Sequence, residues 1–481
     1  MKKIAYFLLI IPFATLSCIK NPKKDKTTTD KRPNILLIAV DDLNDWIGAL
    51  KGHPQALTPN IDRLANEGML FTNAHCQAPV CNPSRASLMT SLYPSTTGLY
   101  FLNPDIEYSP IAKKNVLMPK RFQDEGYYVT GAGKLFHNAP GLNEKYVPNY
   151  GGNFGDFGPF PEEKLTNFPG HPLWDWGIFP NDDTLMPDHK LATWTESILK
   201  NEITTPFWMG VGFYRPHVPQ YVPKKWFDLY PLDSIQLPKV LRNDLNDISD
   251  YGINITREGH VSPEHKWVIE NDQWKPLVQS YLACVSFVDA QIGRVFDALE
   301  NSNYAENTYI VLFSDHGFHL GEKDRYAKRS LWSDGTRVPL IFWGPNISKG
   351  ISDKPVQLLD IYPTLLELAQ ISADKLHQGH SLLNILKGDG EKWPYHARTS
   401  FGPGNHAIIS ENYRYIHYND GSEEFYDHTT DPHEWINKIK DPKYLYLVEQ
   451  HRASLPKEEH NVLGKGSTGH ITYDISESSK N

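Results

Sequence analysis

Cysteine is scarce in this chain, since only Cys18, Cys76, Cys81 and Cys284 occur among 481 residues. Four cysteines are too few for the disulfide framework that stabilises small secreted proteins. Basic residues are not in excess either: 48 Lys and Arg face 57 Asp and Glu, and the net charge is −9. A protein whose main partner is nucleic acid would more often carry a basic surface, so we expect no nucleic-acid partner. Whether Cys76 and Cys284 pair with each other stays open.

The apolar run near the N-terminus is too short to span a bilayer comfortably. It extends from Ile4 to Leu16, follows Lys2 and Lys3, and precedes Ser17 and Cys18. A basic start, a short apolar run and a small residue before the cleavage point are typical of an export signal. We therefore expect residues 1–18 to be a signal peptide and the chain to be exported.

A small residue directly before Cys18 favours a bacterial lipoprotein, in which Cys18 would become the lipid anchor. Thr15 stands where such sites usually have Leu, so a plain cleaved signal peptide is the alternative. Residues 19–32 are rich in Lys, Thr and Asp and have no apolar period, as expected of a solvated tether. The expected location is the periplasm or the outer membrane of a Gram-negative bacterium.

Several short apolar runs end in a polar or charged cluster. They cover residues 34–40 before Asp41 and Asp42, 127–130 before Lys134, 207–213 before His217, 309–313 before Asp315, and 338–343 after Arg337. Runs without alternation fit strands that are buried on both faces of a mostly parallel sheet. Because ligands bind at the carboxyl ends of such strands, we expect these clusters to form one site.

Helical patterns at residues 59–67, 275–299 and 357–369 lie between these runs. Alternating strands and helices predict an α/β fold. We assign residues 33–370 to a catalytic domain with a mostly parallel sheet flanked by helices. Short strand patterns at 407–410 and 413–418 indicate a smaller C-terminal α+β domain over residues 371–481.

The most informative string is Cys81-Asn82-Pro83-Ser84-Arg85, at the start of a predicted helix. Free N–H groups and the helix dipole favour an anion there, and Arg85 lies one turn later on the same side. The string resembles the Cys-x-Pro-Ser-Arg signature of the formylglycine-dependent (type I) sulfatases. The resemblance implies that a separate maturation enzyme oxidises Cys81 to 3-oxoalanine (formylglycine). A hydrated aldehyde has one hydroxyl to attack sulfur and a second whose proton loss expels sulfate.

Two acidic pairs suggest a metal site. Asp41-Asp42 and Asp315-His316 each follow a predicted strand, and oxygen ligands favour a hard divalent cation. The Asp-His pair is similar to the iduronate-2-sulfatase-like branch of the family, which implies one Ca²⁺. The cation would bind the hydroxyl on residue 81, lower its pKa and offset the charge of the sulfate. The expected ligands are Asp41, Asp42, Cys81, Asp315 and His316.

A basic group completes the predicted site. Its members are Arg85, Lys134, His137, His217 and Lys328. Lys134 and His137 resemble the family's Gly-Lys-x-x-His element, and His217 lies in a string similar to its Pro-His-x-Pro element. We expect Arg85 and Lys134 to hold the anion, His217 to protonate the leaving alcohol with help from Lys328, and His137 to take the proton that releases sulfate.

The resemblance covers roughly residues 32–370 and implies an alkaline-phosphatase-like α/β domain. The sequence departs from the family at residues 323–326, which we expect to face the substrate. Expected substrates are sulfated oligo- or polysaccharides carrying sulfated uronate or rhamnose, such as ulvan or glycosaminoglycans, or carrageenan-type galactans. Aromatic residues 174–179 fit either sugar platforms or lid packing. The alternatives are a phosphoesterase or phosphonate hydrolase of the same superfamily and a non-catalytic glycan-binding lipoprotein.

Overall fold

The computed structural model describes Met1 and residues 32–137, 141–257, 261–390 and 392–464. Residues from Arg32 onward form one compact unit. The predicted signal peptide with Cys18, and the tether up to residue 31, lie outside the described residues apart from Met1. Within the described part, no helix combines the length and the apolar character needed to cross a membrane.

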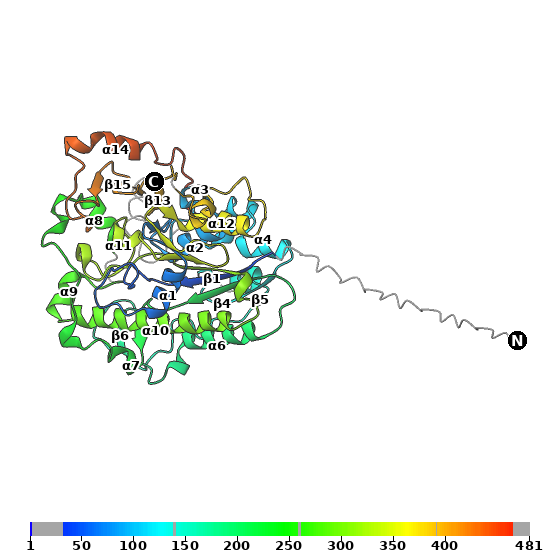
Figure 1. Cartoon of the computed structure of the whole chain (residues 1–481). Helices are drawn as coiled ribbons and strands as arrows, with labels where there is room; N and C mark the ends of the chain where they lie inside the picture. The colour runs from blue at the N-terminus through cyan, green and yellow to red at the C-terminus, as the bar shows by residue number, and fades with distance from the viewer. Residues whose placement is uncertain (2–31, 138–140, 258–260, 391, 465–481) are drawn as a thin grey trace. The chain divides into compact units, whose positions relative to one another are not determined.

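An eight-stranded sheet forms the centre of the unit, in the order β11-β2-β10-β9-β1-β7-β4-β5 (Figure 1). The strands are β1 (Asn34–Val40), β2 (Met69–Phe71), β4 (Tyr128–Gly133), β5 (Asn149–Tyr150), β7 (Phe207–Phe213), β9 (Thr308–Ser314), β10 (Leu340–Trp343) and β11 (Gly350–Ser352). Strands β9, β1, β7, β4 and β5 are parallel, as predicted. Strand β10 runs antiparallel to both neighbours, so the sheet is mixed and mostly parallel, in agreement with the prediction.

The register of the sheet brings four strand ends together. Val40 lies opposite Phe213 of β7 and Ser314 of β9, while Gly133 of β4 lies opposite Gly212. The polar clusters that follow these strands therefore start from the same edge. This is the edge at which parallel α/β sheets place their ligands.

Helices cover both faces of the sheet, as expected for strands that are apolar on both sides (Figure 1). Leu36, Ile38 and Val40 pack with α1 (Pro59–Glu67), α6 (Pro187–Lys200) and α10 (Trp274–Glu300). Ile35, Leu37 and Ala39 pack with α2 (Cys81–Thr90), α4 (Met118–Asp124) and α12 (Ile361–Leu368). Successive residues of β1 thus supply two cores, one on each face.

The helix predicted at 357–369 begins later than expected. Residues Val356–Gln357 form strand β12, and a 3₁₀ turn, η8 (Leu358–Asp360), precedes α12. Gln357 and Asp360 cap this turn reciprocally, since the Asp360 carboxylate accepts the Gln357 N–H at 2.9 Å. The cap fixes the start of the helical segment and leaves the preceding residues extended.

The C-terminal part contains a four-stranded antiparallel sheet, in the order β13-β14-β15-β16. Its strands are β13 (Ala397–Ser400), β14 (His406–Ile409), β15 (Tyr413–His417) and β16 (Glu423–Asp427), and α14 (Leu445–Arg452) packs on it (Figure 1). The two strands predicted here are confirmed. The boundary at residue 370 stays a prediction.

The remaining elements are short. They are β3 (Ala74–His75), β6 (Trp176–Ile178), β8 (Gln220–Val222), α3 (Pro94–Thr97), α5 (Leu142–Tyr146), α7 (Lys224–Phe227), α8 (Asp250–Thr256), α9 (His265–Glu270), α11 (Ser333–Thr336), α13 (Leu383–Leu386), and the 3₁₀ turns η1 (Ile106–Tyr108), η2 (Ala112–Lys114), η3 (Asp183–Leu185), η4 (Leu232–Ser234), η5 (Asp244–Asp247), η6 (Ala305–Asn307), η7 (Glu322–Asp324) and η9 (Pro442–Tyr444). Cys76 and Cys284 are both free, buried thiols. They belong to the cores on opposite faces of the sheet, which answers the open question of their pairing.

Candidate active site

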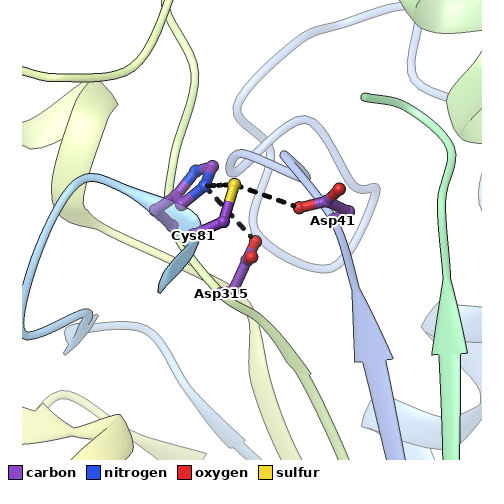
Figure 2. A group of neighbouring side chains, drawn as sticks. Asp41, Cys81 and Asp315 are labelled. Atoms are coloured by element: carbon purple, nitrogen blue, oxygen red, sulfur yellow. Dashed lines mark hydrogen bonds and ion pairs between the residues drawn. The ribbon is translucent and has the colours of Figure 1, made fainter. Parts of the chain in front are cut away.

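Cys81 is the first residue of α2, and its side chain meets the ends of two strands. The residue before it, Val80, is extended, so the helix and its free N–H groups begin at the cysteine. The Cys81 Sγ lies 3.7 Å from Asp41 Oδ1 and 3.1 Å from His316 Nε2. Figure 2 shows the Cys81, Asp41 and Asp315 side chains converging from separate segments. These distant parts of the sequence therefore share one buried centre.

Asp41 and Asp42 both face this centre, although consecutive residues of a strand point to opposite sides. The strand ends at Val40, and Asp42 adopts a left-handed conformation with φ of 63°. Its N–H donates to Asp315 Oδ1 at 3.3 Å. Asp and Asn tolerate this conformation better than other non-glycine residues, which suits an acidic residue at the turn.

Three basic side chains neutralise the three carboxylates. Arg85 Nε lies 2.8 Å from Asp315 Oδ2, and Lys134 Nζ lies 2.5 Å from Asp41 Oδ2. Lys328 Nζ lies 2.6 Å from Asp42 Oδ1 and 3.5 Å from Cys81 Sγ. The carboxylates are fully buried, so the pairing offsets a large desolvation cost.

The acidic side of the centre has the donor set of a cation site. Two overlapping groups of side chains each bring one donor atom per residue to within 4.8 Å of the others. The groups are Asp41, Cys81, Asp315 and His316, and Asp41, Asp42, Cys81 and His217. Asp42 Oδ2 is buried and has no hydrogen-bond partner among the described residues. An uncompensated buried carboxylate oxygen is costly, and a bound cation would satisfy it.

Two histidines stand on the basic side. Burial lowers the pKa of His137, which favours its neutral, basic form, and the Cys81 side chain offsets part of this shift. His217 Nε2 lies 3.9 Å from Asp42 Oδ2, and its Nδ1 lies 2.5 Å from the Val218 carbonyl. The carbonyl fixes the ring orientation and leaves Nε2 toward the centre.

The charges of the centre act on the residue at position 81. Burial alone would raise the pKa of the Cys81 thiol, but Lys134, Lys328 and His316 outweigh burial and hold that pKa well below its usual range. Burial likewise raises the pKa of Asp315, and Arg85 offsets this only in part. An anion at position 81 is therefore favoured by its surroundings.

Sequence reasoning missed two residues that position the basic group. Asp188, on α6, accepts the N–H groups of Tyr214 and Arg215 at 2.8 and 2.9 Å and so holds the loop that carries His217. The Phe157 ring packs against His217 at a tilt of 32°, with centroids 4.5 Å apart, and lies 4.9 Å from Lys134 Nζ. Neither residue stands in a motif, so only the fold reveals them.

The two groups of residues that were predicted to face the substrate have different environments in the structure. Trp174 and Trp176 are buried in the sheet-side core, which agrees with lid packing for these two rings. Residues 323–326 line a cavity of about 320 Å³ together with Arg257 and His265. Lys323 is nevertheless buried, because its Nζ binds Asp244 at 2.8 Å and the Glu434 carbonyl.

A family model described as Sulfatase matches residues 33–371, most of the chain. The chain belongs to the sulfatase family. A second model, N-sulphoglucosamine sulphohydrolase C-terminal, matches residues 321–461 and so extends the likeness over the small antiparallel sheet. The protein is accordingly a hydrolase of sulfate esters, as its Cys81 string predicted.

Curated relatives support this assignment. A sulfatase from Formosa agariphila is 46% identical over 95% of this chain and 92% of its own. An ulvan-active sulfatase of the same bacterium is 29% identical over 94% and 86%. Human iduronate 2-sulfatase is 34% identical over 66% of this chain and 60% of its own. A solved sulfatase structure from Bacteroides thetaiotaomicron (24% identity, 88% and 91% coverage) has a TM-score of 0.69, which confirms the predicted alkaline-phosphatase-like fold.

Proposed function

We propose that this sulfatase removes sulfate esters from uronate or rhamnose units of a sulfated polysaccharide or its oligosaccharides, with formylglycine at position 81 and one calcium ion. The observation that carries the proposal is the convergence of Cys81, three carboxylates and three basic side chains in one buried centre. Support for the substrate class comes from the relatives named for iduronate and for ulvan. Among these substrates, ulvan and glycosaminoglycan oligosaccharides are the first to test.

The residues present fit a hard cation and an oxygen nucleophile. Asp41, Asp42, Asp315 and His316 would hold the calcium, which supplies Lewis-acid stabilisation of negative charge at residue 81. The carboxylates and the three basic side chains balance in charge without an ion, so a divalent cation would make the centre positive and attractive to sulfate. Formylglycine would supply a hydrated nucleophile that can later release sulfate without attack by a second water.

The side chains around position 81 then share the work on the sulfate ester. Arg85 and Lys134 hold the sulfate oxygens, where their charges act most strongly as negative charge builds up. His217 Nε2 delivers a proton to the leaving alcohol oxygen, with Lys328 assisting from the same side. His137, kept neutral by burial, takes the proton whose loss from residue 81 releases sulfate.

The cavity beside residues 323–326 is our proposed site for the rest of the sugar. Arg257, His265 and Lys266 line it, and their donors match the carboxylate of a uronate or a second sulfate. Arg325, which also lines it, donates from Nη2 to the Lys328 carbonyl at 2.9 Å. One side chain thus links the cavity wall to the loop that carries the active-site Lys328.

The decisive experiment joins two measurements. The intact mass of the peptide containing residue 81, after co-expression with a formylglycine-generating enzyme, is expected to show loss of the thiol and gain of the aldehyde. The matured enzyme is then offered sulfated ulvan, glycosaminoglycan and carrageenan oligosaccharides, an aryl sulfate and an aryl phosphate, with Cys81→Ala as the control. Faster turnover of the aryl phosphate would contradict the sulfatase mechanism and favour the phosphoesterase alternative. Glycan binding without turnover, unchanged in Cys81→Ala, would favour a binding lipoprotein.

We also propose that the protein is exported and anchored through Cys18. The support is the N-terminal order of basic residues, apolar run and Ser17-Cys18. Labelling cells with a fatty-acid analogue should tag the mature protein, which begins at Cys18, in the membrane fraction. A Cys18→Ala variant that carries the same label in the same fraction would contradict the anchor, and soluble periplasmic wild-type protein would favour a plain signal peptide.

A further inference from the structure

A second group of metal-type donors lies outside the catalytic centre. It consists of His319, Glu322 and Asp334, and one donor atom from each lies within 4.8 Å of the others. His319 and Glu322 follow the β9 end, while Asp334 belongs to α11. None of the three has a part in the chemistry at position 81.

The His319 ring presents a free nitrogen to this group. The ring is fully buried, and its Nε2 lies 2.7 Å from Ser330 Oγ. Nδ1 is buried without a hydrogen-bond partner among the described residues, and it lies 3.9 Å from Asp334 Oδ2, too far for a hydrogen bond. In the tautomer in which Nε2–H donates to Ser330 Oγ, Nδ1 turns its lone pair toward the carboxylates. Electron-rich atoms facing one another in this way are stabilised by a cation between them.

The two carboxylates have no counter-ion of their own. Glu322 accepts the Leu320 N–H at 2.7 Å, but within the described ranges no Lys or Arg nitrogen lies within 4.0 Å of Glu322 or Asp334. The adjacent Lys323 turns instead to Asp244. Burial and the nearby Asp45 raise the pKa of Glu322 to about 7. A catalytic carboxylate such as Asp41, by contrast, has an ammonium group beside it.

Close packing holds the three donors in place and leaves one side open. A Cβ on Gly335 would lie 2.4 Å from Ser330 Oγ and 3.3 Å from His319 Nε2, so only glycine fits there. A Cβ on Gly317 would lie 2.1 Å from the Asp334 carbonyl. The Asp334 side chain is 34% exposed, which gives an ion a way in from solvent.

We propose that His319, Glu322 and Asp334 bind a divalent transition-metal ion of the zinc class. One imidazole and two carboxylates, with water in the remaining position, form a ligand set that zinc accepts, whereas the catalytic centre offers three carboxylates, the ligands that calcium prefers. The ligands lie on both sides of Lys328 in the sequence. The ion therefore fastens the two ends of the loop that carries this active-site lysine.

The test is zinc binding with calcium in excess, so that the catalytic centre does not compete for zinc. Chelator-treated full-length protein is equilibrated with Zn²⁺, passed through a desalting column and analysed for metal per chain. Wild type should retain one zinc, and the matched control Asp41→Asn/Asp315→Asn should retain it as well. Glu322→Gln/Asp334→Asn should lose it, with affinity falling at least about tenfold in Asp334→Asn alone.

Cobalt provides a second readout that does not depend on activity. Co²⁺ should give a visible absorption band in the wild type and in the control, and His319→Gln should remove it because the variant loses one of the three protein ligands and therefore the bound ion. The Asp334→Asn variant changes only a partly exposed carboxylate, so it keeps the test valid if the double variant does not fold. Wild-type protein that retains no zinc, or zinc retained equally by wild type and Glu322→Gln/Asp334→Asn, would overturn the proposal.

Discussion

Two buried groups of charges in this protein differ in how completely their acidic members are satisfied. In the Glu434 cluster, which we define as Glu434, Arg414 and His428, Glu434 Oε1 accepts from Arg414 Nε at 2.6 Å and contacts His428 Nε2 at 2.8 Å. Its Oε2 accepts the Ser333 N–H at 2.8 Å. In the catalytic centre, Asp42 Oδ2 has no such partner within the described residues.

The difference separates a structural role from a chemical one. The Glu434 cluster joins the small antiparallel sheet to α11, and a carboxylate with every oxygen bonded there adds stability and leaves nothing to bind. The catalytic centre leaves the Asp42 Oδ2 oxygen and the Cys81 thiol available for binding. The cost is the free energy needed to bury charged groups away from water. Substitutions in the catalytic centre should therefore reduce activity without destabilising the fold. Substitutions in the Glu434 cluster should destabilise the fold and leave the activity of the folded enzyme intact.

The largest effect is expected at Cys81. Cys81→Ala removes the proposed nucleophile, so activity on any sulfate ester should fall by about 10⁴-fold or more. The melting temperature should change little, because the thiol is one of several donors in the centre. Sulfate release and thermal melting of the same preparation check this. Activity within tenfold of wild type would exclude Cys81 as the nucleophile.

The next effect concerns the acidic side of the centre. Asp315→Asn keeps the shape but removes a charge that faces Arg85 at 2.8 Å. Calcium content and activity should fall together, by about 10²–10³-fold in kcat/KM. Added calcium should restore part of the activity at high concentration. Full activity with no bound metal would contradict a metal role for Asp315.

In the Glu434 cluster, Arg414→Met should destabilise the fold by about 3–5 kcal/mol, because it leaves Glu434 buried without its guanidinium partner. Folded enzyme should retain its kcat. Chemical unfolding and turnover at low temperature check the two statements separately. The double variant Arg414→Met/Glu434→Gln should recover part of the lost stability, and failure to do so would argue against the buried-charge explanation.

Leaving-group chemistry distinguishes the role of His217. His217→Ala should lower kcat by about 10²-fold for an alkyl or sugar sulfate, whose oxygen needs a proton on departure. The loss should be small for a nitrophenyl sulfate, whose phenolate leaves unaided. Equal losses on both substrates would indicate that His217 orients the sulfate, and a larger selective loss in Lys328→Ala would assign the proton to Lys328.

Short sequence motifs and apolar runs predicted the central strands and the side chains that meet at their ends. The bounds of β1 and β7 agree with the predicted runs, and residues placed at strand ends, such as Asp41, Lys134 and Asp315, do meet. They could be predicted because parallel strands bring their carboxyl ends to one edge, whatever the rest of the chain does.

The rest depended on contacts between distant segments. Three features have no local signature in the sequence: the reversal at β10, the Asp188 carboxylate that holds the His217 loop, and the packing of Phe157 against His217. Lys323 shows why such contacts cannot be predicted from local sequence. Its partners, Asp244 and the Glu434 carbonyl, lie 79 and 111 residues away in the chain. No pattern around residue 323 could show that its charge points inward.

The smallest expected effect is the acid sensitivity of the Glu434 cluster. Burial alone would raise the pKa of Glu434, but Arg414 and His428 outweigh burial and hold that pKa well below the usual 4.5. The stabilisation is thus complete above about pH 4.5 and is lost as the pH falls toward the lowered pKa. The free energy of unfolding of Glu434→Gln should therefore fall less than that of wild type between about pH 5 and pH 3. The exposed Glu449→Gln is the matched control; parallel curves for wild type and Glu434→Gln would show that Glu434 carries no such linkage.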